Sequence, residues 1–386
     1  MSVFDRHPRM RWAVPAAAAG LIVAGVAVAP LAATADSGLP TRTAQDLLVD
    51  LTQPTTQAVS GTVATKVDLG LPDLPMGMVP SNGPLALALG DGTVRVWSDG
   101  PQRQRVAVLA PNAETTMVRD GREVWVWSSA EATADRYELP DGDAGMGLPS
   151  ELPEGVTVPS TPQEAAALAL SAIDPTTEVT TSGVARVAGR DAYELVLTPR
   201  AEGTLVQRVT LAIDAETKVP LRVQVFSTKQ AAPAVQVGFT SVDFSTPDAS
   251  LFDFTPPPGA TVTDHDLAAA KGPAVSPEEL AAGKDAGAAE PTVVGEGWTA
   301  VAVGTLPVGG LADLAEQGST PEGDDGRGDP AATALALLQA MPTTSGTWGT
   351  GRVLAGTLFS VIVTDDGRFA VGAVPPEALG AALARR

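Results

Sequence analysis

The sequence contains no cysteine and only two histidines, His7 and His265. The absence of cysteine excludes disulfides, thiolate zinc sites and cysteine nucleophiles, and it leaves no thiol to carry a lipid anchor. A Ser-His-Asp triad would have to use His265, because His7 lies in the basic N-terminal region discussed below. The chain therefore offers little to the common chemistries of hydrolases and zinc enzymes.

Basic residues are also scarce. The chain has 25 Lys and Arg against 45 Asp and Glu, which gives a formal charge of −20. An acidic chain without a basic stripe is a poor candidate for binding nucleic acid. The same charge opposes binding to anionic membrane surfaces, so any lipid is expected in a pocket. The imbalance is strongest over residues 264–330, where 13 acidic and 3 basic residues give −10.

Motifs for catalysis are missing as well. The sequence has no G-x-S-x-G, no P-loop and no H-E-x-x-H. Residues 322–329 offer several oxygen ligands, but they lack the spacing of a calcium-binding EF-hand loop. We therefore predict no catalytic residue, no metal site and no cofactor, and hence a protein that is not an enzyme.

The N-terminus has the layout of an export signal. Three arginines between residues 6 and 11 precede an apolar run over residues 13–33, which ends in Ala33-Thr34-Ala35. A basic region, an apolar region and an A-x-A sequence predict a secretory signal peptide over residues 1–35, cleaved after Ala35. The apolar run is about 20 residues long, which is enough to span a bilayer, so an uncleaved N-terminal anchor is the alternative.

Most of the chain from residue 59 to 262 consists of short runs in which apolar and polar residues alternate, as is typical of β-strands. Asp-Gly pairs at 99–100 and 120–121 are typical of hairpin turns. Because the strands follow one another over short turns, we expect them to pair antiparallel. The predicted strands cover residues 59–69, 93–98, 102–109, 115–119, 123–128, 136–139, 179–187, 191–197, 205–213, 221–226 and 235–239, and helices are predicted at 41–51 and 161–173.

The last of these strands carry the most specific pattern of the chain. One motif, over residues 213–223, has the form I-D-x-x-T-x-x-P-L-R-V, and a second, over residues 252–259, reads FDFTPPPG. Together they resemble the LolA/RseB superfamily of envelope proteins, which includes lipoprotein carriers and lipid sensors. The resemblance covers roughly residues 43–264. It implies an α+β fold, a half-open antiparallel β-barrel with helices plugging its concave face.

Composition suggests how the chain is divided. The predicted half-barrel domain takes residues 36–264, and residues 265–296, rich in Ala, Gly, Pro and acidic residues, are predicted to be a linker. Residues 297–386 are predicted to form a small α+β module, with strands at 298–303, 351–354, 358–364 and 369–374 and helices at 311–316, 330–341 and 376–385.

Some strands are apolar on both faces. Residues 123–128 read EVWVWS, so the valines face one side and the tryptophans the other, and residues 94–97 repeat this pattern. A sheet with one solvated side should not show it. Either the tryptophans are incidental surface residues, or a curved sheet surrounds a hydrophobic cavity. The candidate lipid-binding residues of such a cavity are Val94, Val96, Trp97, Val124, Trp125, Val126, Trp127, Leu195, Leu197, Val223, Val225, Phe226 and Phe239.

The apolar, proline-rich loop over residues 71–84 is the other candidate segment. The resembled family has a flexible loop over the mouth of its cavity near this point, which makes Leu74, Met76 and Met78 candidates for the mouth. An ordinary connector is the alternative. The family also uses an arginine to tune release of its cargo, and Arg95, Arg103 and Arg105 are the candidates here.

The resemblance implies an exported, non-enzymatic protein that binds acyl chains of a lipid or lipoprotein, for carriage or sensing in the cell envelope. The alternative is an RseB-like regulatory protein that binds an anti-sigma factor or an envelope ABC transporter. No nucleic acid partner is expected, and the chain is expected to be a monomer.

Overall fold

The structure is a computed structural model, and it contains two compact units, Met1–Pro40 and Thr41–Arg386. All elements described below belong to the second unit. The structure describes residues 39–52, 58–71, 91–110, 113–139, 161, 176–266, 292–305 and 341–385.

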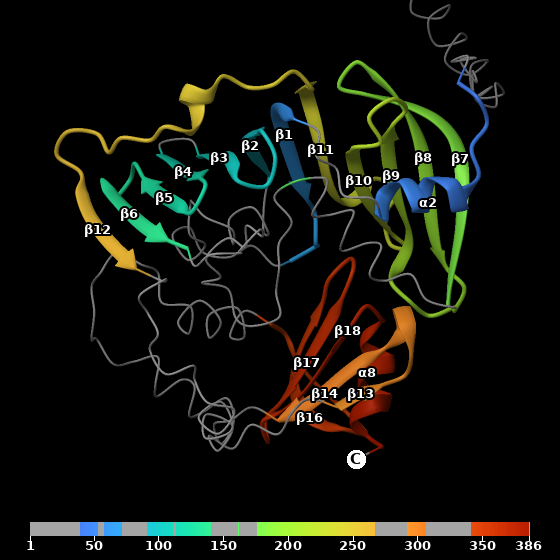
Figure 1. Ribbon diagram of the computed structural model, residues 1–386. Helices are drawn as coiled ribbons and strands as arrows, with labels where there is room; N and C mark the ends of the chain where they lie inside the picture. Colours follow the sequence, from blue (N-terminus) through green and yellow to red (C-terminus); the bar gives the residue numbers. More distant parts are fainter. Residues whose placement is uncertain are drawn as a thin grey trace, which may run out of the picture. The chain divides into compact units, whose positions relative to one another are not determined.

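The larger of two sheets has twelve strands in the order β12-β6-β5-β4-β3-β2-β1-β11-β10-β9-β8-β7 (Figure 1). β1 lies in the interior of this sheet, with β2 to β6 following on one side and β11 to β7 on the other. The strands are β1 Val59–Val67, β2 Gly92–Ser98, β3 Arg103–Ala110, β4 Ala113–Asp120, β5 Glu123–Ser128, β6 Thr133–Glu138, β7 Thr177–Val187, β8 Arg190–Pro199, β9 Val206–Asp214, β10 Pro220–Ser227, β11 Pro233–Asp243 and β12 Thr261–Asp266.

The predicted antiparallel meander is confirmed in both halves of this sheet. From β1 to β6, and again from β7 to β11, each strand pairs antiparallel with its neighbour in sequence. β5 has the predicted bounds, and the other predicted strands differ from the observed ones by a few residues at their ends. Short turns between alternating strands leave antiparallel pairing as the only option, which is why the sequence predicts this part well.

Two features correct the predicted fold class. β12 was not predicted and pairs parallel with β6, so the sheet is mixed rather than antiparallel. The described residues are mostly β, with two short α-helices, α2 (Ala44–Thr52) and α8 (Pro376–Leu383). The predicted second plug helix at 161–173 lies outside the described residues, apart from Thr161. A parallel pair needs a long connection, and here the chain between β6 and β12 covers residues 139–260 and includes β7 to β11.

Side chains on both faces of β12 contact side chains of β6. On one face, the Asp264 carboxylate lies 3.6 Å from the Arg136 guanidinium. On the other, the His265 ring stacks on Tyr137 at 4.6 Å between centroids, and its Nε2 lies 2.9 Å from Asp135 Oδ1. These contacts explain how a short and polar segment forms an edge strand.

α2 begins after Thr43, which acts as its N-cap. The Asp46 backbone N–H donates to Thr43 Oγ1 at 3.1 Å, and the Thr43 N–H donates to Asp46 Oδ2 at 3.2 Å. This reciprocal cap satisfies two backbone donors at the start of the helix. The helix packs against β7, and its Leu47 is completely buried.

The C-terminal strands form a separate six-stranded antiparallel sheet in the order β13-β14-β18-β17-β16-β15. Helix α8 packs on this sheet, and Leu379 and Leu383 of the helix join Trp348 and Ile362 in its core. The first strand lies at the end of the predicted linker, and β15 was not predicted. The strands are β13 Thr292–Val294, β14 Val301–Thr305, β15 Thr343–Gly346, β16 Gly349–Ala355, β17 Ser360–Thr364 and β18 Arg368–Gly372.

Hydrogen bonds join the two sheets. Thr357, in the turn between β16 and β17, donates its N–H to Leu69 O and its hydroxyl to Asp68 O, both at 2.8 Å. Its own carbonyl accepts the Ser227 hydroxyl at 2.6 Å. The Leu205 N–H donates to Ala373 O at 2.7 Å. The C-terminal sheet therefore contacts the large sheet directly, in addition to its covalent connection.

Candidate functional site

The strand registers sort the predicted site residues onto two opposite faces of the large sheet. We call the face that carries Val94 the aliphatic face and the face that carries Trp97 the aromatic face. By register and alternation, the aliphatic face holds Val94, Val96, Val124, Val126, Leu195, Leu197, Val223, Val225 and Phe239, and the aromatic face holds Trp97, Trp125, Trp127 and Phe226. One cavity cannot be lined by both sets, because the sheet lies between them.

The aliphatic face is continuous across the sheet. In the half formed by β8 to β11, one row of cross-strand partners is Leu197, Val209, Val225 and Val235. The adjacent row is Leu195, Leu211, Val223 and Val237. Through β1 and β2 the face continues into the other half, where Val63 is the partner of both Phe239 and Val94. Rows of this kind are what stabilises a sheet, and here they also make one long apolar surface.

Burial differs along this face. In the β8 to β11 half, Leu195, Leu197 and Leu211 are completely buried, whereas Val225 and Val235 are half-buried. In the β3 to β5 region, Val106, Val108 and Val126 are only half-buried. Met117 lies between Val106 and Val126 in the register and is 5% exposed. The sequence analysis did not name Met117 as a candidate. Its predicted strand precedes residues 123–128, which are apolar on both faces, and this pattern could have identified it.

Two tryptophans of the aromatic face, Trp97 and Trp125, lie close to arginines. The Arg105 guanidinium carbon lies 5.7 Å from the Trp97 ring centroid, and that of Arg136 lies 5.9 Å from the Trp125 ring. On the other half of the sheet, Arg208 approaches Phe226 to 3.7 Å. Such cation–π contacts stabilise exposed sites by roughly 0.5–1 kcal/mol each. They account for the half-buried rings of Trp97 and Trp125 without a ligand.

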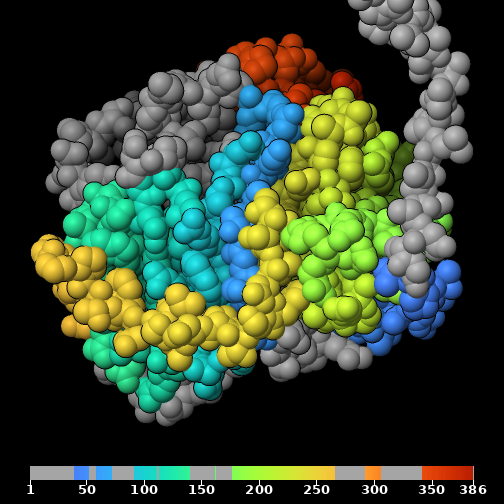
Figure 2. All heavy atoms as spheres, turned by 90° about the horizontal axis from the view of Figure 1, so that it is seen from above, coloured from blue at the N-terminus to red at the C-terminus, as the bar shows by residue number. Residues whose placement is uncertain are grey.

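Residues 244–260, which we call the strap, cross the aromatic face on their way to β12. Figure 2 shows this yellow segment running over the cyan and teal strands. The strap includes a short 3-10 helix, Ala249–Phe252, which contacts β3 and β4. Phe252 is 2% exposed and lies beneath the Arg103 guanidinium, and Phe254 packs against Trp125 with 5.5 Å between ring centroids. The F-x-F motif thus supplies the two rings that fix the strap to the sheet.

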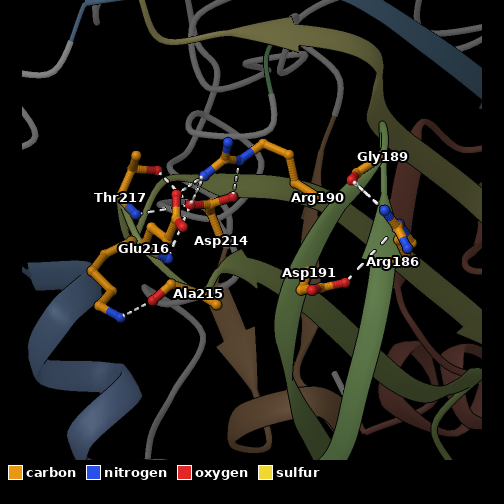
Figure 3. A network of polar contacts seen from close by, with 9 residues as sticks. Arg186, Gly189, Arg190, Asp191, Asp214, Ala215, Glu216 and Thr217 are labelled. Carbon is orange, nitrogen blue, oxygen red and sulfur yellow. Dashed lines mark hydrogen bonds and ion pairs between the residues drawn. The ribbon is translucent and has the colours of Figure 1, made fainter. Parts of the chain in front are cut away.

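The other sequence motif, over residues 213–223, forms a buried ionic turn between β9 and β10 (Figure 3). The Asp214 side chain is completely buried and accepts hydrogen bonds from the Thr217 N–H at 2.8 Å, the Thr217 hydroxyl at 2.9 Å and the Glu216 N–H at 3.1 Å. Arg190 donates to both of its carboxylate oxygens. The motif therefore holds a turn in place, and its Asp is satisfied by the chain itself.

These hydrogen bonds determine the charge states of Asp214 and Arg190. Burial by itself would raise the pKa of Asp214, but the hydrogen bonds from Arg190 and Thr217 outweigh burial and hold the pKa below its ordinary value of 3.8. The same hydrogen bond to Asp214 raises the pKa of Arg190. Both groups stay ionised near neutral pH and are poorly suited to moving protons in catalysis.

A small cleft opens elsewhere, where the β2–β3 and β4–β5 turns meet. Its volume is about 540 Å³, and its lining includes Arg103, which is paired with Asp99, as well as Asp120 and Gly121. No group of three or more His, Cys, Asp or Glu with metal-binding geometry occurs among the described residues. Within the same part of the chain, neither helix has the length and apolarity that crossing a membrane would require. The predicted mouth residues Leu74, Met76 and Met78 lie outside the described ranges.

Residues 93–268, which span β2 to β12, match the family model of the MucB/RseB N-terminal domain. This match confirms the resemblance to the LolA/RseB superfamily predicted from the sequence motifs. The match covers slightly less than half of the chain and includes both faces described above, the strap and the Asp214 turn. A search of the curated proteins finds no match.

Among solved structures, the chain is similar to the Pseudomonas aeruginosa MucA/MucB complex, with 16% identity, a TM-score of 0.42, and coverage of 88% of this chain and 96% of the other. A LolA superfamily protein from Nitrosomonas europaea has 15% identity and a TM-score of 0.20, over 55% of this chain and 98% of the other. Mycobacterium tuberculosis lipoprotein LppX has 10% identity and a TM-score of 0.25, over 50% and 90%. At these scores, the three likenesses carry no argument about function.

Proposed function

We propose that this protein is an exported, non-enzymatic binding protein that holds acyl chains of a lipid or lipoprotein against the aliphatic face. The observation that carries the proposal is the continuous apolar surface of that face, which is mostly buried but only half-buried at Val106, Val108 and Val126. A half-buried apolar surface next to a methionine suits a flexible apolar ligand, because methionine adapts to irregular shapes. The match of residues 93–268 to the MucB/RseB N-terminal domain, together with the resemblance to the LolA/RseB superfamily, supports the same function.

The expected affinity follows from burial. Each buried CH₂ group contributes about 0.8 kcal/mol, so an acyl chain that buries about ten of them gains about 8 kcal/mol. That corresponds to a dissociation constant near 1 μM before the cost of ordering the chain. The negative net charge agrees with a ligand that is held by apolar contacts rather than by a basic surface.

Native mass spectrometry of the gently purified protein tests this function. We expect lipid or fatty acid to copurify, and we expect the emptied protein to take up a fluorescent fatty acid in the micromolar range. Failure of both measurements, with circular dichroism showing a folded β protein, would contradict acyl-chain binding.

An RseB-like regulatory role is the second candidate, and the match to the MucB/RseB domain favours it. In solved structures, Pseudomonas aeruginosa MucB forms a complex with MucA. By analogy, this chain would bind the extracytoplasmic part of an anti-sigma factor or of an ABC transporter. A sigma factor gene beside the gene of this protein favours regulation, whereas an ABC transporter gene favours carriage.

Export is part of both proposals and rests on the predicted signal peptide at residues 1–35, which lies outside the described residues. We expect the protein in the cell envelope, as a monomer, with either a cleaved N-terminus or an N-terminal anchor. N-terminal sequencing of the purified protein distinguishes cleavage after Ala35 from an intact N-terminus.

A further inference from the structure

Two neighbouring arginines of the aromatic face have no acidic partner within the described part of the chain, and the same holds for Arg208 beside Phe226 in the other half of the sheet. Arg103 is paired with Asp99, and Arg136 lies 2.8 Å from Glu123. Arg95 and Arg105 form no ion pair with any residue in the part of the chain that the structure describes. In a protein with a net charge of −20, two neighbouring cations without an acidic partner call for an explanation.

The register brings these two side chains together. Arg95 is the cross-strand partner of Ala107, and Arg105 is the partner of Trp97, so the two arginines occupy diagonal positions on adjacent strands and share one face. Diagonal neighbours have backbones roughly 7–8 Å apart, which long side chains span easily. Both guanidinium groups can therefore reach one ligand.

Arg105 is held in position but not satisfied. Its Nη1 donates to Leu251 O of the strap at 3.2 Å, and its guanidinium lies over the Trp97 ring. Its Nε is buried and has no hydrogen-bond partner. Arg95, two residues from Trp97, is exposed to solvent. Buried unsatisfied donors are rare in proteins, and an absent ligand is one reason for them.

The surroundings of the pair suit an extended chain. Ala107 and Thr116, on the same face, are small and covered by their neighbours, with 3% and 1% exposed, and the Thr116 hydroxyl donates to Glu114 Oε1 at 2.6 Å. Half-buried Trp97 and Trp127 stand on the same face. Guanidinium groups bind carboxylates through paired hydrogen bonds, and tryptophan rings accept apolar side chains.

We propose that Arg95 and Arg105 bind a carboxylate of an acidic, extended segment of a partner protein. A phosphate of a bound lipid is the less suitable ligand, because an acyl chain on the aliphatic face lies on the other side of the sheet. The net charge of −20 repels acidic molecules at long range. The two arginines therefore act at short range, on a segment that places single carboxylates between them rather than on a broad acidic surface.

Fluorescence anisotropy with a short labelled peptide that alternates valine with glutamate tests this site in the full-length protein. We expect Arg95→Gln to weaken binding about tenfold, as is typical for the loss of one charge-assisted hydrogen bond. Arg105→Lys keeps the charge but loses the planar fork, and we expect a similar loss. Arg122→Gln is the matched control, because this exposed arginine belongs to the β4–β5 turn and is paired with Glu138; we expect it to bind like the wild type.

The corresponding peptide with glutamine in place of glutamate should bind at least about tenfold more weakly to the wild type. Equal affinity for both peptides, or equal binding by the Arg95→Gln and wild-type proteins, would overturn the proposal. So would a peptide affinity weaker than about 1 mM. Binding to phosphatidylglycerol vesicles that is stronger than to the peptide and is lost in Arg95→Gln would assign the site to lipid phosphate instead.

Discussion

At the scale of single residues, the clearest case is the buried carboxylate of Asp214. An isolated buried charge would cost several kcal/mol, and here Arg190, Thr217 and Glu216 compensate it. Arg190 also lies 4.9 Å from the Phe244 ring centroid at the start of the strap. The Asp214 turn therefore connects the β7–β8 hairpin, the β9–β10 turn and the strap.

We expect Asp214→Asn to lower the free energy of unfolding by about 3 kcal/mol, because it leaves the Arg190 guanidinium without its buried partner. Urea unfolding followed by circular dichroism measures this loss. Glu216→Gln is the control, because Glu216 binds the same arginine but its side chain is 82% exposed; its expected cost is below about 1 kcal/mol. Equal effects of the two substitutions would contradict the account.

The difference in stability between wild type and Asp214→Asn should also depend on pH. The pKa of Asp214 is lowered in the folded state, so its contribution is fully present above the ordinary value of 3.8. The contribution is lost as the pH falls through the lower pKa of the folded protein. Unfolding free energies measured from pH 7 downward should therefore converge only in acid below pH 4. A difference that stays constant into strong acid would contradict this.

Gly61 is a second position at which the fold leaves no room for a different residue. A Cβ at this position would lie 2.3 Å from Ser241 O and 3.0 Å from the Phe239 ring. We expect Gly61→Ala to destabilise the protein by about 1–3 kcal/mol, as overpacking does. Thermal unfolding measures it, with Ser60→Ala as the neighbouring control. An unchanged melting temperature for Gly61→Ala would show that β1 and β11 are not paired this closely.

At the scale of elements, alternation predicted strands and turns, but it did not predict distant pairings. β5 was predicted with its observed bounds because EVWVWS alternates valine with tryptophan, which both favour strands, and follows an Asp-Gly turn. β12 was missed because its residues, TVTDHD, are mostly polar and its partner lies more than a hundred residues earlier in the chain. Alternation also separates the two faces of one strand, yet only the register shows that the valine faces of all strands coincide. The individual candidate residues could therefore be predicted from the sequence, but not how they divide between the aliphatic and the aromatic face.

The strap is the element that depends most on two side chains. We expect Phe252→Ala to cost about 3–5 kcal/mol, because Phe252 is almost completely buried. Phe254→Ala, at a half-buried ring, should cost less and should alter the emission of Trp125, which it contacts. Tryptophan fluorescence and urea unfolding of both variants measure these effects. A larger loss of unfolding free energy for Phe254→Ala than for Phe252→Ala would show that burial of these rings does not determine how strongly the strap is attached to the sheet.

At the scale of the whole molecule, the two faces of the large sheet suggest two binding roles. The aliphatic face offers an apolar surface that is half-buried near Val126, and the aromatic face offers arginines and tryptophans beside the strap. The acyl-chain proposal concerns the first face, and the carboxylate proposal concerns the second. A protein built this way can bind a lipid and a protein partner at the same time, since the sheet keeps the ligands apart.

Titration of a fluorescent fatty acid into two neighbouring variants tests the central claim most directly. Val126 and Trp127 are adjacent in β5, half-buried and on opposite faces. We expect Val126→Asn to weaken binding of the probe about tenfold, because it places an amide in the apolar contact. Trp127→Asn should leave the affinity unchanged. The opposite result, with loss of binding in Trp127→Asn and none in Val126→Asn, would contradict acyl-chain binding on the aliphatic face.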